Sequence, residues 1–65
     1  MFERREYRVH KRGERWRILR GVIAIATGDR VSAIESAQRL AESDRPSRVV
    51  IENDQGDAEA EWMFD

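Results

Sequence analysis

Six basic side chains follow one another closely in the first third of the chain, and together they could bind phosphate groups. They are Arg8, His10, Arg12, Arg15, Arg17 and Arg20. Guanidinium groups contact nucleic-acid phosphates, and an exposed Trp16 or Tyr7 could stack on a base. These six residues are therefore the candidate contacts for a nucleic acid or another macromolecular partner.

Catalytic chemistry has few candidate residues. His10 is the single histidine, and no nearby serine or cysteine forms an obvious nucleophile pair with it. We expect His10 to be a solvent-facing residue of a strand. No glycine-rich phosphate cradle is present, since Gly21 and Gly28 only punctuate strands. The sequence predicts no catalytic residue, no cofactor and no enzyme.

Carboxylates in the last third could in principle bind a hard cation such as calcium. Their spacing does not match an EF-hand loop; they are Asp54, Asp57, Glu59 and Glu61. We expect Asp54 to form a turn and no metal to bind. Glu59 and Glu61 alternate along one strand face and are expected to form cross-strand ion pairs with Arg8, Lys11, Arg15 or Arg17.

The two halves of the chain carry opposite charge. Residues 1–30 have nine Lys/Arg against four Asp/Glu, whereas residues 31–65 have three against nine. Such asymmetry can mark a nucleic-acid-binding face, or it can mean that the halves pair within one sheet or across a dimer. We prefer the pairing interpretation.

The chain is short, with 65 residues and no cysteine. A domain of this size buries only about 60% of its unfolded surface, and neither a disulfide nor a structural zinc site supports it. Self-association is the remaining common way to stabilise a domain this small. The charged first residues resemble no signal peptide, and the longest apolar run, residues 22–26, is too short for a membrane span. We expect a cytoplasmic protein without membrane attachment.

Alternation of apolar and polar residues predicts an initial β-hairpin. Tyr7 and Val9 should point inward from the first strand, Gly13 should form the turn, and the alternation resumes at Trp16. The β-branched run at residues 22–26 predicts a third strand or an extension of the second strand.

Apolar residues at spacings of three and four predict one amphipathic helix after Asp29, which is a suitable N-cap. The stripe consists of Ala33, Ile34, Ala37, Leu40 and Ala41. Pro46 disfavours helical geometry at Arg45, so the helix should stop near residues 43–44.

A second hairpin should complete the fold. Its turn contains Gly56, and its return strand places Ala58, Ala60, Trp62 and Phe64 toward the helix. The fold class is thus α+β, an antiparallel sheet of four or five strands with one helix on one face, in the order β-β-(β)-α-β-β. The single domain spans residues 1–65, with strands at about 6–11, 15–20, 22–27, 48–52 and 57–64 and a helix at about 30–43.

The residues also resemble a family of short bacterial and archaeal proteins, domain of unknown function 2188. The resemblance rests on residues 16–18, Gly21, the helix pattern from Asp29 to Ala41, residues 49–51, Gly56 and the terminal aromatics. It covers most of the chain and implies two strands, a helix and two strands. Asp29 and Arg30 depart from the threonine and lysine expected there, and the chain ends after Asp65. The resemblance implies no functional residue.

Most aromatic residues should lie in the core, because so small a domain has few large apolar side chains. The sheet face away from the helix should carry Ile23 and Ile25 or Val50 and Met63, depending on register, and an uncovered apolar patch would favour dimerisation. We therefore expect a non-enzymatic interaction or accessory domain, preferably a homodimer, with an unidentified protein partner. The alternative is a nucleic-acid-binding module that uses the arginines of the first hairpin.

Overall fold

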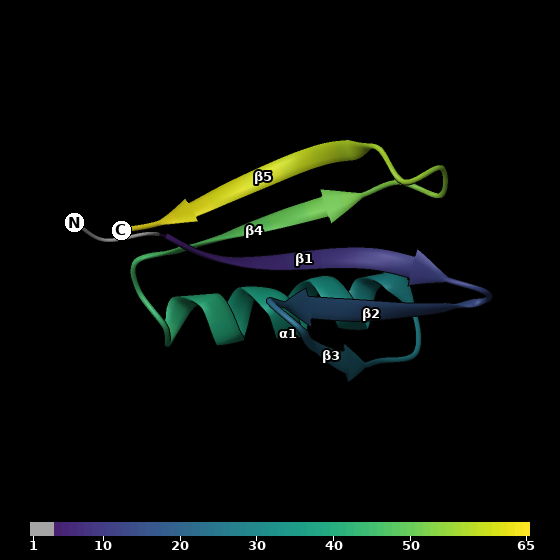
Figure 1. Ribbon diagram of the computed structural model, residues 1–65, viewed down its shortest axis with the longest axis horizontal. Coiled ribbons are helices and arrows are strands. Elements are labelled where there is room, and N and C mark those ends of the chain that lie inside the picture. Colours follow the sequence, from purple (N-terminus) through teal and green to yellow (C-terminus); the bar gives the residue numbers. More distant parts are fainter. Residues whose placement is uncertain (1–3) are drawn as a thin grey trace.

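A computed structural model describes residues 4–65 as a five-stranded sheet with one helix (Figure 1). The predicted ranges agree with these elements to within one residue at each end. The elements in chain order are β1 (Arg5–Arg12), β2 (Arg15–Arg20), β3 (Ile23–Ala26), α1 (Arg30–Glu42), β4 (Ser47–Glu52) and β5 (Ala58–Phe64).

The strands lie in the order β3-β2-β1-β4-β5, with β1 at the centre. Three neighbouring pairs are antiparallel, but β1 and β4 run parallel, with Tyr7 opposite Val49. The predicted α+β class is confirmed, and the sheet is mixed rather than purely antiparallel. The parallel pair arises because α1 carries the chain back along the sheet before β4 begins (Figure 1).

Glycines at the first position of two-residue loops close the first two hairpins. Gly13 and Gly21 have φ values of 65° and 59°, and no non-glycine residue among those described has positive φ. A positive φ at the first loop residue alone is the type II′ pattern, whose twist suits antiparallel strands. A side chain at either position would strain the turn.

Alanines form the face by which α1 packs on the sheet. Ala33, Ala37 and Ala41 are completely buried, and they meet a layer from the strands that contains Tyr7, Val9, Trp16, Ile18, Val49 and Ile51. Because alanine side chains are short, the helix backbone lies close to the sheet. Ile34 packs at the margin of this core, whereas Leu40, expected in the stripe, is 37% exposed.

The aromatic residues divide between core and surface. Tyr7 and Trp16 are buried, and Phe64 packs partly against the core. Trp62 pairs with Val49 and so lies on the helix side of β5, as predicted, but it remains 43% exposed. The helix contacts β1, β2 and β4, and β5 lies at its margin. An exposed aromatic therefore remains on the outermost strand.

A side-chain cap at its start and a backbone hydrogen bond at its end mark the limits of the helix. Asp29 accepts a hydrogen bond from the backbone N–H of Ser32 at 2.9 Å, which confirms the predicted N-cap. At the other end, the backbone N–H of Ser43 donates to the carbonyl of Arg39, and the helix stops before Pro46 as expected.

Enlarging the helix's packing face should destabilise the fold. Ala37→Leu should lower the free energy of unfolding by about 1–3 kcal/mol, because no space exists for three more carbon atoms between α1 and the sheet. Urea unfolding followed by circular dichroism measures this difference. Glu35→Leu, at an exposed position of the same helix, is the control and should change stability little. Equal effects of the two substitutions would show that the helix does not pack as described.

Candidate functional site

One face of the sheet is covered by α1 and the other has no covering layer among residues 4–65 (Figure 1). Side chains alternate between faces along each strand, so the neighbours of the core residues lie on the uncovered face. One row across that face runs Ala24, Leu19, Arg8, Val50 and Glu61. Val50 and Met63 lie there, whereas Ile23 and Ile25 lie on the helix side. The second of the two register alternatives is therefore correct.

Two arginines on the uncovered face are neutralised by carboxylates. Arg8 donates to Glu6 at 3.0 Å and to Glu52 at 2.8 Å. Arg48 donates to Glu6 at 2.8 Å and lies 3.4 Å from Glu61. Burial alone would raise the pKa of Glu6, but the hydrogen bonds and charges of Arg8 and Arg48 lower it on balance. This half of the face is an internally balanced network of ions.

The remaining basic residues of the face have no acidic partner among the described residues. His10 lies opposite Arg17, and Arg12 lies opposite Arg15 at the hairpin turn. We call these four residues the basic end. Two of their nitrogen atoms, His10 Nε2 and Arg17 Nε, are shielded from solvent without a hydrogen-bond partner in the described chain.

The surroundings of His10 favour its neutral form. Burial lowers its pKa below 6.5, and the positive charge of Arg17 lowers it further, whereas Glu52 acts in the opposite direction. His10 is partly buried rather than freely solvent-facing. The basic end thus combines three guanidinium groups with an imidazole whose pKa is lowered.

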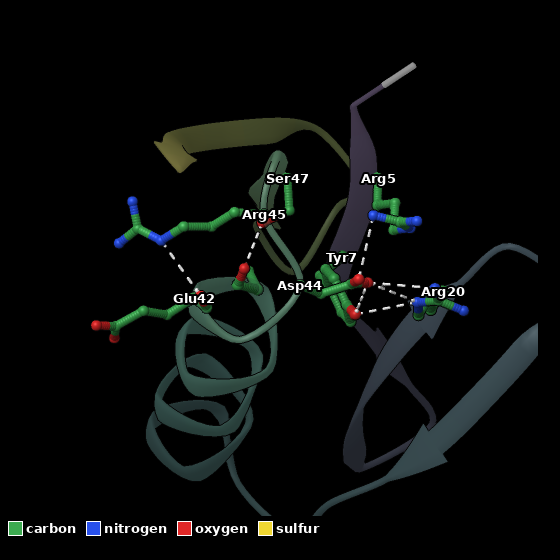
Figure 2. A network of polar contacts seen from close by, with 8 residues as sticks. Arg5, Tyr7, Arg20, Glu42, Asp44, Arg45 and Ser47 are labelled. Atoms are coloured by element: carbon green, nitrogen blue, oxygen red, sulfur yellow. Dashed lines mark hydrogen bonds and ion pairs between the residues drawn. The ribbon is translucent and has the colours of Figure 1, made fainter. Parts of the chain in front are cut away.

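Arg20 does not belong to this surface, contrary to the prediction. It lies two residues after the buried Ile18 and so points to the helix side of β2. Figure 2 shows its guanidinium beside Tyr7 and Asp44, with Nε 3.0 Å from the Tyr7 hydroxyl and Nη2 3.2 Å from Asp44 Oδ2. The alternation along β2 already indicates that Arg20 and Ile18 lie on the same side of the sheet.

Asp44 is the centre of that second polar network. It accepts a hydrogen bond of 2.5 Å from the Tyr7 hydroxyl and also pairs with Arg5 at 3.2 Å (Figure 2). The hydrogen bond from Tyr7 has the largest effect on the pKa of Asp44, and together with Arg20 and Arg5 it lowers that pKa despite partial burial. Burial and the neighbouring Asp44 raise the pKa of Tyr7. The network joins β1 and β2 to the segment between α1 and β4.

The predicted partners of Glu59 and Glu61 are wrong. Because β5 pairs with β4 and not with the first hairpin, Glu61 lies near Arg48, and Glu59 pairs with Arg30 of α1. Even so, several ion pairs join the basic first half to the acidic second half, as the charge pattern indicated. They are Arg4–Asp65, Arg5–Asp44, Arg8–Glu52, Arg20–Asp44 and Arg30–Glu59.

A shallow depression of about 480 Å³ lies where β1 begins and β2 ends. Its lining consists of Arg5, Glu6, Arg8, Leu19, Arg20 and Gly21. The lining contains no histidine, serine, threonine or lysine, and its arginines are engaged by Glu6, Glu52 and Asp44. Across residues 4–65 no group of three potential metal ligands converges. The depression offers neither a nucleophile nor a general base other than Glu6.

Sequence reasoning missed three members of the uncovered face, Glu6, Arg48 and Glu52. Because side chains alternate along a strand, the inward-facing neighbours of these residues in β1 and β4 would have placed them on the uncovered face. Their mutual contacts depend on the parallel pairing of β1 with β4, which alternation does not reveal.

Removing the charge of Asp44 should flatten the acid side of the stability profile. Since the folded pKa lies below the ordinary value of 3.8, this carboxylate stabilises the fold above that value and ceases to do so as pH falls through the folded pKa. Asp44→Asn should therefore be less stable than the native chain at neutral pH, with the difference shrinking in acid. Urea unfolding at a series of pH values measures it. Asp54→Asn, in the exposed loop before β5, controls for net charge, and a constant difference at all pH values would contradict the assignment.

Comparisons with known proteins give no match: no family model, no curated protein and no solved structure is similar to the chain. The resemblance to domain of unknown function 2188 stays a prediction. Among the described residues, α1 is neither long nor apolar enough to cross a membrane. The geometry of the two polar networks is thus the basis for a functional proposal.

Proposed function

We propose that the chain is a non-enzymatic binding module whose uncovered sheet face docks an acidic segment of a partner protein. The observation that carries the proposal is the basic end, His10, Arg12, Arg15 and Arg17. It lacks acidic partners among residues 4–65, on a face otherwise balanced by ion pairs. A cytoplasmic location is part of the proposal and follows from the composition.

Like charges at the hairpin turn support a binding role. Arg12 and Arg15 are direct cross-strand partners, an arrangement that destabilises a hairpin. A carboxylate-rich segment would relieve this repulsion and supply acceptors for the guanidinium groups. The free protein keeps the repulsion, and the complex would remove it.

The rest of the face favours a protein over a nucleic acid. Glu6, Glu52 and Glu61 continue the surface beyond the basic end, where Arg8 and Arg48 neutralise them. The positive charge without an acidic partner among the described residues is therefore confined to one end of the sheet and forms no track for a phosphate backbone across it. The aromatic rings that could stack on bases, Tyr7 and Trp16, are buried on the helix side. The half-buried Leu19 and the exposed Met63 lie among these ions, and such a mixed surface is closer to the composition of a protein interface.

Nucleic-acid binding through phosphate contacts is the second candidate, and the same basic end is the observation that favours it. Without a stacking platform on this face, such binding would depend almost entirely on charge. Its affinity would then fall steeply as salt concentration rises, because each phosphate contact releases counterions.

The absence of a catalytic role is argued from the same geometry. His10 is separated from the depression lined by Arg5, Glu6 and Arg8, and that depression holds no nucleophile among the residues described. A general base needs to be within reach of a reacting group in a substrate pocket. No such arrangement of described side chains supports an enzyme.

Loss of charge at the basic end should weaken binding of an acidic probe. Arg12→Gln with Arg17→Gln should reduce affinity for a fluorescent polyglutamate peptide about tenfold, since two exposed ion pairs contribute up to roughly 1 kcal/mol each. Fluorescence anisotropy at low and high salt measures the affinity. Lys11→Gln with Arg39→Gln makes the same change in net charge away from the face and should bind as the native chain does.

Short duplex and single-stranded DNA serve as competing probes in the same assay. Equal loss of peptide binding in both double variants would show that only net charge matters and would contradict the proposed surface. A strong, salt-sensitive complex with DNA, lost in the Arg12/Arg17 variant while the peptide is ignored, would establish the second candidate instead.

A further inference from the structure

The outer edge of β5 is a seven-residue strand edge that no strand covers within the described part of the chain. An open edge presents unpaired backbone N–H and C=O groups to any strand that approaches. The other edge strand, β3, has only four residues. β5 also exposes Trp62 at 43% and Met63 at 54%. The largest exposed side chain of the domain thus lies on its longest free edge.

We propose that two copies of this chain associate by antiparallel pairing of their β5 edges, about a two-fold axis at Trp62. A two-fold axis that relates adjacent antiparallel strands stands perpendicular to the sheet. Both helices then lie on the same face, and the residue at the axis meets its own copy. The register is fixed once the residue at the axis is known.

Charge excludes two of the alternative registers. With Glu61 at the axis, Glu61 would face its own copy. With Ala60 at the axis, Glu59 would face Glu61 of the second copy twice. Acidic residues directly opposite one another destabilise a strand pair. Repulsion that involves Glu59 and Glu61 therefore disfavours the registers with Glu61 or Ala60 at the axis.

Length and size complementarity favour Trp62 over Met63. With Met63 at the axis only residues 62–64 overlap within the two strands, whereas with Trp62 residues 60–64 overlap. In the Trp62 register, Ala60 faces Phe64 of the second copy, so that a small side chain meets a large one, and Glu61 faces Met63 rather than another acidic residue. Glu59, near the start of β5, would face Asp65 just past the end of the second strand. Arg30 and Arg4 already pair with these two carboxylates.

The bulge between β4 and β5 does not interrupt this overlap. The register irregularity lies at Ile51 and Glu52, opposite the start of β5, and residues 60–64 pair regularly with β4. The regular part of the edge is the part that would pair.

The dimer would be one continuous sheet of ten strands with both uncovered faces on the same side. The two basic ends would then lie on the same face at diagonally opposite corners of the sheet, because the axis reverses the strand direction. A partner long enough to reach both could make two linked contacts, which would raise overall affinity. Association through β5 does not depend on what the uncovered face binds. The basic end lies on β1 and β2, and β4 separates these strands from the edge of β5.

Single cysteines test the register directly, because the chain has none of its own. Residues directly opposite each other on two strands have Cα atoms about 5.5 Å apart or less, which permits a disulfide. In a symmetric strand pair only the residue on the axis lies opposite its own copy, so only a cysteine at that position can form this disulfide. Under mild oxidation Trp62→Cys should form a covalent dimer at least tenfold faster than Val31→Cys, an exposed apolar position on α1. Fastest formation by Glu61→Cys or Met63→Cys, or equal rates for Trp62→Cys and Val31→Cys, would overturn the register.

Light scattering after size exclusion tests the association itself. The native chain should have twice the mass of 7.6 kDa at low and high salt. Trp62→Lys should become monomeric with an unchanged circular dichroism spectrum, and Val31→Lys should remain dimeric. A native monomer, or a Trp62→Lys variant that stays dimeric, would overturn the proposal. Anisotropy with the acidic probe is measured separately, so failure of either proposal can be recognised.

Discussion

One thirteen-residue helix can cover only one face of a five-stranded sheet, and this limit determines most of the structure's polar chemistry. On the covered face, the short alanine side chains of α1 pack against larger side chains of the strands. The opposite face has to remain compatible with water on the monomer, and it does so by ion pairs over a partly shielded Val50. Long arginine side chains cover such apolar positions with their aliphatic stems while keeping the charge exposed.

Two polar networks result, and they have different tasks. On the helix side, Asp44 collects Tyr7, Arg5 and Arg20 beside the end of the helix, where the chain turns back into the sheet. On the uncovered side, Glu6 and Glu52 collect Arg8 and Arg48 across β1 and β4. The first network fixes how α1 and β4 follow each other, and the second keeps a bare sheet face balanced. Neither network includes the basic end.

Local patterns were sufficient for the elements but not for their neighbours. Alternation, Gly13, the Asp29 cap and the alanine spacing predicted every strand and the helix, because each of these features acts within a few residues. The parallel pairing of β1 with β4 depends on where the helix returns the chain, and no local pattern specifies that. Every contact that follows from this pairing, such as Arg8 with Glu52, was therefore missed. Arg20 is different. Alternation from the inward-facing Ile18 places it on the helix side, but it was grouped with the basic surface because it is an arginine.

Natural sequences tend to satisfy their local rules everywhere except where function requires otherwise. In this chain the exception is narrow. Arginines on either face find carboxylates at the start and middle of the sheet, yet the same sequence places Arg12 opposite Arg15 and Arg17 opposite His10. A glutamate at residue 15 or 17 would have completed a cross-strand pair at no cost in strand length or packing. The basic end is therefore the part of the described sheet whose basic side chains have no carboxylate partner within residues 4–65.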